Sequence, residues 1–351
     1  MKTKGGHGKR QVRTMEELAL AIDVSRPTLS RYFQDPDRVS LSSKARIERG
    51  LEAVEYVPNF FASRMNRKST GVIGVIIPYL NDLFFSKLLE AIERAAMDAG
   101  FTVIAQCSHS DPEIEARAAE TLMSMNVDGA LVAPLGNQSD EKIHERLSAR
   151  MPYILVDSRP RNMPDIDFVG TDHMQSTALA TRYLCRVGAP PVFLAMPRVN
   201  FNAVERERAY LATMEELGHA PRIIGAEPLD TVNAFEAHGE AVLDREFAAG
   251  RLVEDSILCV NDRVAIGALR AAASHRLEPG ARRFGGLRIM GHDDYPLCPF
   301  TVPSLTTVAQ NVEAIGRESV SRLQAAIRGE KVSDELGVKL FPGELKMRQS
   351  A

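Results

Sequence analysis

The spacing of hydrophobic and polar positions changes twice along the chain, and these changes predict three segments. Residues 1–12 are polar and rich in Gly and Lys, which is typical of a disordered arm. Residues 13–57 carry apolar residues at helical spacing in three short stretches. From Gly71 onward, short β-branched runs alternate with longer amphipathic stretches. The pattern therefore predicts a small all-α head followed by an α/β body.

The body has the pattern of repeated strand–helix–strand units. The predicted strands are 71–78, 101–105, 129–132, 153–156, 192–195, 257–260 and 287–291. The predicted helices are 84–99, 112–125, 139–149, 173–187, 203–217, 234–248, 262–274 and 311–328. Such alternation with short connections predicts parallel sheets that are covered by helices on both faces. Because roughly 280 residues exceed one ordinary sheet of this kind, we expect two α/β lobes.

Local signals predict where the helices of the head begin. Thr14 is followed three residues later by a glutamate, which fits a capping box, and Ser25 is placed to cap a second helix over 26–33. Pro27 falls in the first turn of that helix, where its missing N–H costs little. A third helix is expected near 42–54. This is a helix-turn-helix pattern, and an ordinary three-helix packing unit with a solvated basic face is the alternative.

Charge is divided unevenly between the head and the body. The formal net charge is −3, but residues 1–70 hold 14 Lys and Arg against 8 Asp and Glu. The head is therefore at +6 and the rest of the chain at −9. A basic head on an acidic body indicates that the head meets a polyanion and the body does not.

Composition excludes several classes of protein. With 44% hydrophobic and 25% charged residues the chain is neither disordered nor fibrous, and no apolar run approaches the roughly 18–20 residues that span a bilayer. The basic N-terminus has no apolar segment behind it, so it is not a signal peptide. The four cysteines lie far apart without a CxxC motif, which favours reduced thiols over metal ligands. We therefore expect a cytoplasmic protein with no membrane partner, metal or cofactor.

No catalytic motif stands out. GxSxG, HExxH, a P-loop and GxGxxG after a strand are all absent, and His144-Glu145 lacks the second histidine of a zinc motif. The sequence therefore does not predict an enzyme, although activity on a sugar is kept as a weaker alternative.

Four stretches of the head form a recognisable series: TMEELA (14–19), VSRPTLSR (24–31), PDRVS (36–40) and YVPN (56–59). Together they resemble the DNA-binding head of the lactose-repressor (LacI/GalR) family of bacterial transcription regulators. The resemblance implies that Arg26, Pro27 and Arg31 face base edges in the major groove. Arg31 is the expected guanine reader, because a guanidinium can bond to O6 and N7 together. The full set of implied DNA contacts is Thr14, Ser25, Arg26, Pro27, Thr28, Ser30, Arg31, Asn59, Ala62 and Met65.

Residues 58–70 resemble the hinge helix and linker of that family. Alone, so short a helix does not hold in water, so we expect it to order only when two copies pack together on DNA. Met65 then occupies the position of the side chain that wedges into the minor groove, and Ala62 occupies the small position that allows close approach. A plain flexible linker is the alternative.

The resemblance continues through the body. It rests on IIPYLNDLFF (76–85), MPYILVD (151–157), FVGTD (168–172), RERAY (206–210), CVND (259–262), MGHDD (290–294), PSLTT (303–307) and PGELKMRQS (342–350). It implies a periplasmic-binding-protein type 1 fold over 71–351, in which two lobes are joined by three crossovers near residues 171, 300 and 332. The expected N-terminal lobe is 71–170 with 301–331, and the expected C-terminal lobe is 172–299 with 332–351.

The implied ligand site lies in the cleft between these lobes, at the carboxyl ends of the strands. Amides, carboxylates and a guanidinium suit adjacent hydroxyl groups, and an aromatic face suits the C–H side of a sugar. The implied contacts are Phe84, Phe85, Asp157, Asn200, Asn202, Arg206, Phe235, Asn261 and Asp293. Asp262 is expected to cap its helix, and Asp82-Leu83 stand where the family has asparagine and proline.

We therefore interpret the protein as a ligand-responsive transcription regulator, and specifically as a repressor. It is expected to bind a near-palindromic operator in nucleoid DNA as a homodimer. Its effector is expected to be a sugar or sugar derivative. The alternatives are a regulator that responds to a non-sugar metabolite and a solute-binding protein of a sugar transport system. The solute-binding protein would need a signal peptide and would have no use for residues 13–66.

Overall fold

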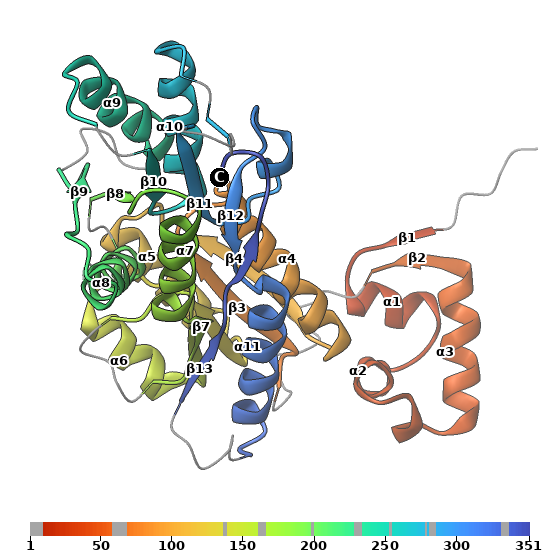
Figure 1. Cartoon of the computed structure of the whole chain (residues 1–351). Coiled ribbons are helices and arrows are strands. Elements are labelled where there is room, and N and C mark those ends of the chain that lie inside the picture. Colours follow the sequence, from red (N-terminus) through yellow and green to blue (C-terminus); the bar gives the residue numbers. More distant parts are fainter. Residues whose placement is uncertain are drawn as a thin grey trace, which may run out of the picture. The chain divides into compact units, whose positions relative to one another are not determined.

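The computed structural model describes residues 10–57, 69–135, 139–160, 166–197, 200–227, 234–252, 255–277, 279–280, 286–330 and 337–351. The chain divides into two compact units, Met1–Thr70 and Gly71–Ala351 (Figure 1). Each unit is treated by itself.

The first unit is a three-helix head with a small two-stranded sheet. Its elements are β1 (Arg10–Val12), α1 (Met15–Ala21), α2 (Arg26–Gln34), a 3-10 turn (Pro36–Arg38), α3 (Leu41–Ala53) and β2 (Val54–Tyr56). Leu18, Leu29 and Ile47 are fully buried, so one residue from each helix meets at the centre of the core. The turn between α1 and α2 contains Asp23 in the left-handed region, at φ 54°. Aspartate tolerates that conformation better than most residues.

Strand β1 corrects the prediction of a disordered arm over residues 1–12. Arg10 to Val12 pair in parallel with Val54 to Tyr56, and Val12 is buried in the core of the head. The prediction also carried the third helix on to Val54, which instead begins β2. These strands are only three residues long, so neither has enough length for an alternating pattern to show in the sequence.

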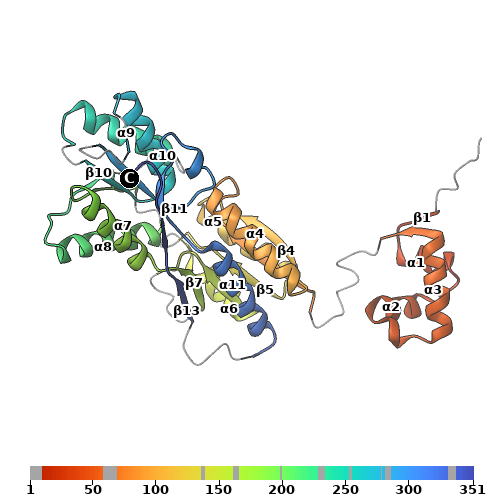
Figure 2. The same cartoon turned by 45° about the vertical axis from the view of Figure 1, so that its right-hand side comes forward.

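The second unit contains two six-stranded sheets, each with helices on both faces (Figures 1 and 2). The first sheet has the order β13-β7-β6-β5-β3-β4 and is parallel throughout. Its strands are β3 (Val72–Ile77), β4 (Thr102–Cys107), β5 (Gly129–Val132), β6 (Tyr153–Val156), β7 (Phe168–Thr171) and β13 (Val338–Phe341). Its helices are α4 (Leu83–Asp98), α5 (Pro112–Ser124), α6 (Glu141–Arg150) and α11 (Val312–Ile327). This sheet and its helices are called the first lobe.

Strand β3 shows how the sequence covers both faces of that sheet. Ile73, Val75 and Ile77 belong to the apolar cluster that includes α4 and α11. Val72 and Ile76 point the other way, into the cluster that α5 and α6 complete. Alternate residues of one continuous apolar run therefore fill two different cores, as is usual for a buried parallel strand.

The second lobe is built in the same way. Its sheet has the order β14-β12-β11-β10-β8-β9 and is parallel except for the antiparallel pair β12/β14. The strands are β8 (Val192–Leu194), β9 (Ile223–Ile224), β10 (Ser256–Cys259), β11 (Arg288–Asp293), β12 (Thr306–Ala309) and β14 (Glu344–Lys346). The helices are α7 (His173–Val187), α8 (Phe201–Glu216), α9 (Phe235–Ala248) and α10 (Asp262–Ser274). Both lobes thus have the predicted α/β architecture with parallel sheets.

Helices α9 and α10 approach each other closely at two glycines. A Cβ on Gly267 would lie 1.9 Å from the carbonyl oxygen of Glu236, and a Cβ on Gly239 would lie 2.3 Å from that of Val264. Because these neighbours are backbone atoms, a larger side chain at either position would force the helices apart.

The crossovers between the lobes differ from the prediction at two of three places. The first lies after Thr171, near the predicted residue. The second follows β12, because Thr306–Ala309 pairs with Met290–Asp293 in the second sheet. The third follows β13, because Val338–Phe341 pairs with Phe168–Thr171 in the first sheet. The expected assignment of 301–331 to the first lobe and of 332–351 to the second is therefore corrected at these two strands.

In the described part of the chain, no helix combines the length and apolar character needed to cross a membrane.

Candidate functional site

The second helix of the head exposes a polar edge that begins at its N-terminus. Ser25 caps α2, accepting a hydrogen bond from the backbone N–H of Thr28 at 3.3 Å, and Pro27 lies in the first turn. Arg26, Pro27 and Arg31 are exposed, and Thr28 and Ser30 are half-buried. The cap and the buried Leu29 fix how the helix lies, so these side chains are presented from a rigid element.

Thr14 plays the capping role that the sequence predicted. Its side chain accepts a hydrogen bond from the backbone N–H of Glu17 at 3.1 Å, and the Glu17 carboxylate accepts from the backbone of Thr14. The backbone N–H groups of Arg13, at 2.9 Å, and of Thr14 both donate to the Glu17 carboxylate and lower its pKa. The capping box accounts for Thr14 by itself, and its role as a DNA contact stays a prediction.

The two arginines of α2 differ in their surroundings. Arg26 forms an ion pair with Glu16 of α1 at 2.9 Å. In the described part of the chain Arg31 takes part in no ion pair or side-chain hydrogen bond, and it lies exposed one helical turn further along α2. Arg31 is therefore the more available of the two guanidinium groups for an anionic or guanine partner.

The predicted hinge contacts Asn59, Ala62 and Met65 lie in residues 58–68, outside the described residues. Their roles stay predictions.

The body contains a cavity of about 340 Å³ between the two lobes. All nine side chains that the sequence named as ligand contacts line it: Phe84, Phe85, Asp157, Asn200, Asn202, Arg206, Phe235, Asn261 and Asp293. Many of them follow the ends of parallel strands or begin the helices that come next, which is where open α/β sheets place ligands. The cavity has the size of a small organic ligand. Contact of these nine side chains with a ligand stays a prediction.

Arg206 on α8 organises the polar floor of this cavity. Its guanidinium donates to His173 Nδ1 at 3.3 Å, to the carbonyl oxygen of Val260 at 2.8 Å and to Asp293 Oδ1 at 3.0 Å. Its side chain is only 6% exposed, so three separate elements fix its orientation. This burial shows that Arg206 is not a solvent-exposed surface arginine.

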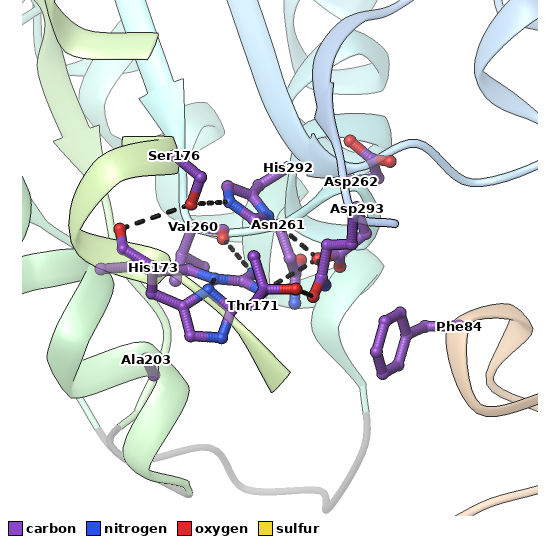
Figure 3. Close-up of polar contacts among 12 residues, drawn as sticks. Phe84, Thr171, His173, Ser176, Ala203, Val260, Asn261, Asp262, His292 and Asp293 are labelled. Atoms are coloured by element: carbon purple, nitrogen blue, oxygen red, sulfur yellow. Dashed lines mark hydrogen bonds and ion pairs between the residues drawn. The ribbon is translucent and has the colours of Figure 1, made fainter. Parts of the chain in front are cut away.

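Asp293, at the end of β11, gathers several donors on one oxygen. Its Oδ1 accepts from Arg206, from Gln310 Nε2 at 2.7 Å and from His292 Nδ1 at 3.1 Å (Figure 3). Burial alone would raise the pKa of Asp293, but Arg206 and His292 outweigh burial and hold the pKa below its ordinary value. Burial lowers the pKa of His292 to about 4, so His292 is neutral and donates from Nδ1 to the carboxylate.

Asp157, which follows β6, has a different environment. It is 5% exposed and lines the cavity, and its backbone is left-handed at φ 67°. Burial raises the pKa of Asp157 to about 7, although Arg206 and a hydrogen bond from Asn202 act in the opposite direction. The nearby carboxylates of Asp293 and Asp82 add to the increase.

Asn261 takes the capping role that the sequence predicted for Asp262, and it also lines the cavity. Asn261, not Asp262, is the N-cap of α10, and its Oδ1 accepts from the backbone N–H of Val264 at 2.9 Å. Asp262 is fully buried and accepts from Thr307 Oγ1 at 2.6 Å and from the backbone N–H of Tyr295 at 2.8 Å. Asp262 therefore fixes the loop after β11, while the amide of Asn261 lies at the cavity.

The aromatic side chains come from both lobes. Phe84 packs in the core of the first lobe and also lines the cavity. Its ring meets that of Phe85 edge to face, with centroids 5.2 Å apart. Phe235 lies at the start of α9 and carries the guanidinium of Arg263 over its ring, 4.9 Å from the centroid.

Sequence reasoning missed a contact between the lobes beside the cavity. Asp82, from the first lobe, accepts a hydrogen bond from the hydroxyl of Tyr295, from the second lobe, and pairs with Arg263 at 3.2 Å. Arg263 is also bonded to both oxygens of Glu236, at 2.7 and 2.8 Å. Asp82 also caps α4. A carboxylate where the family has asparagine was the only signal in the sequence.

Gln310 was also missed, because it lies in the second crossover. Its amide donates to Asp293, and its carbonyl oxygen accepts from the hydroxyl of Thr171 in the first crossover. The third crossover is tied to the same region, since the backbone N–H of Gly343 donates to Gln175 Oε1 at 2.8 Å. The second crossover is therefore bonded to Asp293, which lines the cavity, and the first crossover reaches Asp293 through Gln310. The third is bonded to the first turn of α7.

Within the described residues, no group of three or more His, Cys, Asp and Glu side chains is placed to hold a metal ion.

Comparisons with known proteins agree with this organisation. A family model described as "Periplasmic binding proteins and sugar binding domain of LacI family" matches residues 70–341. Among curated relatives, the HTH-type transcriptional repressor CytR of Escherichia coli strain K12 is 27% identical and covers 96% of each chain. The HTH-type transcriptional regulator GntR of the same strain is 24% identical, and the alignment covers 95% of this chain and 99% of GntR. These relatives are transcription regulators and not enzymes.

A solved structure of the Lac repressor dimer bound to operator and the anti-inducer ONPF superposes with a TM-score of 0.82 at 24% identity. The superposition covers 96% of this chain and 98% of the Lac repressor chain. A complex of the transcriptional regulator CelR with cellobiose superposes with a TM-score of 0.68 at 21% identity. That superposition covers 96% of this chain and 99% of the CelR chain. At these identities the structures establish the fold. Together with the family match, they show that the chain belongs to the LacI family of transcription regulators and has a body with the two-lobed fold of periplasmic binding proteins.

Proposed function

We propose that this protein is a repressor that binds a near-palindromic operator as a homodimer, and that a small carbohydrate in the cavity between its lobes controls that binding. The observation that carries the proposal is one chain with both a capped, arginine-bearing helix in its head and a polar, ligand-sized cavity in its body. A regulator that responds to a ligand needs both a DNA-binding element and a ligand-binding cavity.

The head supports DNA binding through shape and charge. Helix α2 follows a tight turn and exposes Arg31 beside the half-buried Ser30 and Thr28, which suits insertion of its N-terminal half into a major groove. The head carries a net charge of +6, so phosphate contacts would add affinity that is independent of base sequence. The proposed domain boundaries are 13–57 for this head, 58–70 for the hinge and 71–351 for the effector-binding part.

A carbohydrate suits the cavity because both polar and aromatic side chains line it. Arg206, Asn261 and Asp157 offer donors and acceptors to neighbouring hydroxyl groups, and Phe84 and Phe235 offer faces to C–H groups. The CelR structure contains cellobiose, and the body matches the sugar-binding domain of the family.

Control of DNA binding would act through the connections between the lobes. A ligand that contacts both lobes favours one relative orientation, and it acts only through its different affinity for the two orientations. Gln310 and Thr171 tie two crossovers to Asp293, so a change at the floor of the cavity reaches the connections directly. The same ligand could then permit or prevent pairing of two hinge segments in a dimer. We place this activity in the cytoplasm, at nucleoid DNA.

The test is selection of DNA by the purified full-length protein. Sheared genomic DNA from the source organism is incubated with the wild type, and bound fragments are sequenced. We expect enrichment of a small set of near-palindromic sites, and loss of that enrichment in Arg31→Ala. Arg117→Ala removes an exposed arginine from α5 of the body and is the matched control, with unchanged enrichment expected. Equal recovery of all fragments by the wild type would refute the proposal.

A further inference from the structure

The charges around the cavity are predominantly negative. Three carboxylates line it, from Asp82, Asp157 and Asp293, against one guanidinium, from Arg206. No lysine and no second arginine is among the described lining residues. By Coulomb's law such a lining disfavours an acidic ligand, and it favours a cation wherever one of the carboxylates lacks a positive partner.

Two of the three carboxylates already have such partners. Asp293 is paired with Arg206 at 3.0 Å and accepts from Gln310 on the same oxygen. Asp82 is paired with Arg263 at 3.2 Å and accepts from the hydroxyl of Tyr295. These charges are compensated within the protein, so a ligand gains little by approaching them.

Asp157 is the exception. In the described part of the chain it forms no ion pair, and Asn202, which hydrogen-bonds to it, is neutral. Arg206 is the nearby cation, but its guanidinium is bonded to His173, Val260 and Asp293. A buried carboxylate without a cationic partner is costly, because burial penalises its charge and nothing repays the penalty.

The position of Asp157 is held firmly. Its backbone N–H donates to the carbonyl oxygen of Val169 at 3.0 Å, and the backbone N–H of Ser158 donates to that of Val156 at 2.7 Å. The left-handed backbone at φ 67° is uncommon for a residue other than glycine.

Ser158 supplies a second, independent sign of a polar ligand at this place. It lines the cavity and is 2% exposed, and its hydroxyl has no hydrogen-bond partner within the described residues. Buried hydroxyl groups are normally hydrogen-bonded, so we expect the Ser158 hydroxyl to form a hydrogen bond with a bound molecule. An ammonium has three N–H donors and could bond to both the carboxylate and the neighbouring hydroxyl.

We propose that the cavity selects an amino sugar, a ligand with a protonated amine beside hydroxyl groups, and that its ammonium binds Asp157 with Ser158 next to it. This inference rests on the proposed function, since it specifies which carbohydrate the cavity takes. The hydroxyl groups of the same ligand would bind Arg206 and Asn261, which also line the cavity. The amino sugar is preferred over neutral and acidic sugars because the protein supplies no cationic partner for the Asp157 carboxylate.

The test is a matched panel of ligands measured by thermal shift and by calorimetry on the full-length protein. The panel contains hexosamines, the N-acetylated hexosamines, the neutral hexoses and the hexuronic acids of the same skeletons. We expect a hexosamine to bind at least tenfold more tightly than its neutral and N-acetylated counterparts, and the uronic acid to bind most weakly. In Asp157→Asn the hexosamine should lose more affinity than the neutral hexose, so that the preference falls below about threefold. Asp140→Asn, at the exposed cap of α6, is the control with unchanged preference.

The possible failures are distinguishable. Tighter binding of a neutral or acidic sugar by the wild type would overturn the inference and leave the proposed carbohydrate control standing. A preference for the amine that survives in Asp157→Asn would overturn the assignment to Asp157. If no member of the panel binds, both this inference and the carbohydrate part of the proposed function fail, whereas DNA selection is judged separately. The wild-type panel decides the preference even if the variant does not fold.

Discussion

Replacing Tyr295 with phenylalanine removes a hydrogen bond that joins the two lobes beside the cavity. The hydroxyl donates to Asp82, and the two residues are 5% and 8% exposed. A buried hydrogen bond to a charged acceptor contributes about 1.5–3 kcal/mol to stability. For a unit of this size, that loss corresponds to a melting temperature lower by about 3–5 °C. Asp82 keeps Arg263 and the backbone N–H of Phe84 as partners, so the loss should stay within this range.

Tyr153→Phe is the matched control for this prediction. Tyr153 is buried in the first lobe, and its hydroxyl has no partner within the described residues. Removing an unpaired buried hydroxyl leaves nothing unsatisfied, so the control should be as stable as the wild type or slightly more stable. Urea unfolding followed by circular dichroism compares the two variants, and it suits a chain without tryptophan.

A double-mutant cycle assigns the effect to this pair. Combining Tyr295→Phe with Asp82→Asn should cost less than the two single losses together, by about 1.5–3 kcal/mol. Additive losses, or a Tyr295→Phe variant as stable as the wild type, would refute the interpretation that this bond holds the lobes together. A second readout is the radius of gyration in solution, which should increase if the lobes separate more readily.

Three further predictions follow from other contacts. Arg31→Ala should cost about 1–3 kcal/mol per half-site in discrimination between the selected operator and a base-substituted one, while ligand affinity stays constant in calorimetry. Asp157→Asn should gain stability relative to the wild type as pH rises from 5 to 8, by up to about 3 kcal/mol. The sign follows because a folded-state pKa of about 7 makes the wild type lose stability as pH rises through that value, and a flat difference across this range would contradict it. Gly267→Ala should cost about 1–3 kcal/mol or more in urea unfolding, because its Cβ would meet the carbonyl oxygen of Glu236 at 1.9 Å. An unchanged midpoint would show that the helices α9 and α10 can separate freely.

Much of the head and of the cavity could be predicted from the sequence because local rules govern them. Thr14 and Ser25 begin their helices through hydrogen bonds within three residues, which a sequence displays directly. Asn261 and Asp293 lie in the cavity because they follow parallel strands, whose carboxyl ends share one edge. The role of Asp262 was mistaken because either of two adjacent polar residues can cap a helix, and only the structure shows which one does.

The parts that escaped prediction depend on contacts between residues far apart in the chain. Asp82 meets Tyr295 across 213 positions, and Thr171 meets Gln310 across 139. No local pattern identifies such pairs. The strand Val338–Phe341 lies at the edge of its sheet and is largely exposed, so it lacks the apolar run that revealed the central strands.

The most direct test of the account measures whether the cavity and the DNA-binding head influence each other. Fluorescence anisotropy gives the affinity of the full-length protein for its selected operator at increasing concentrations of the tightest ligand from the sugar panel. The account predicts a change of at least fivefold in operator affinity at saturation, together with an equal change in ligand affinity when operator is present, because coupling between two binding sites is reciprocal. A ligand that fills the cavity and leaves operator affinity unaltered would contradict the claim that this chain is a regulator controlled through its cleft.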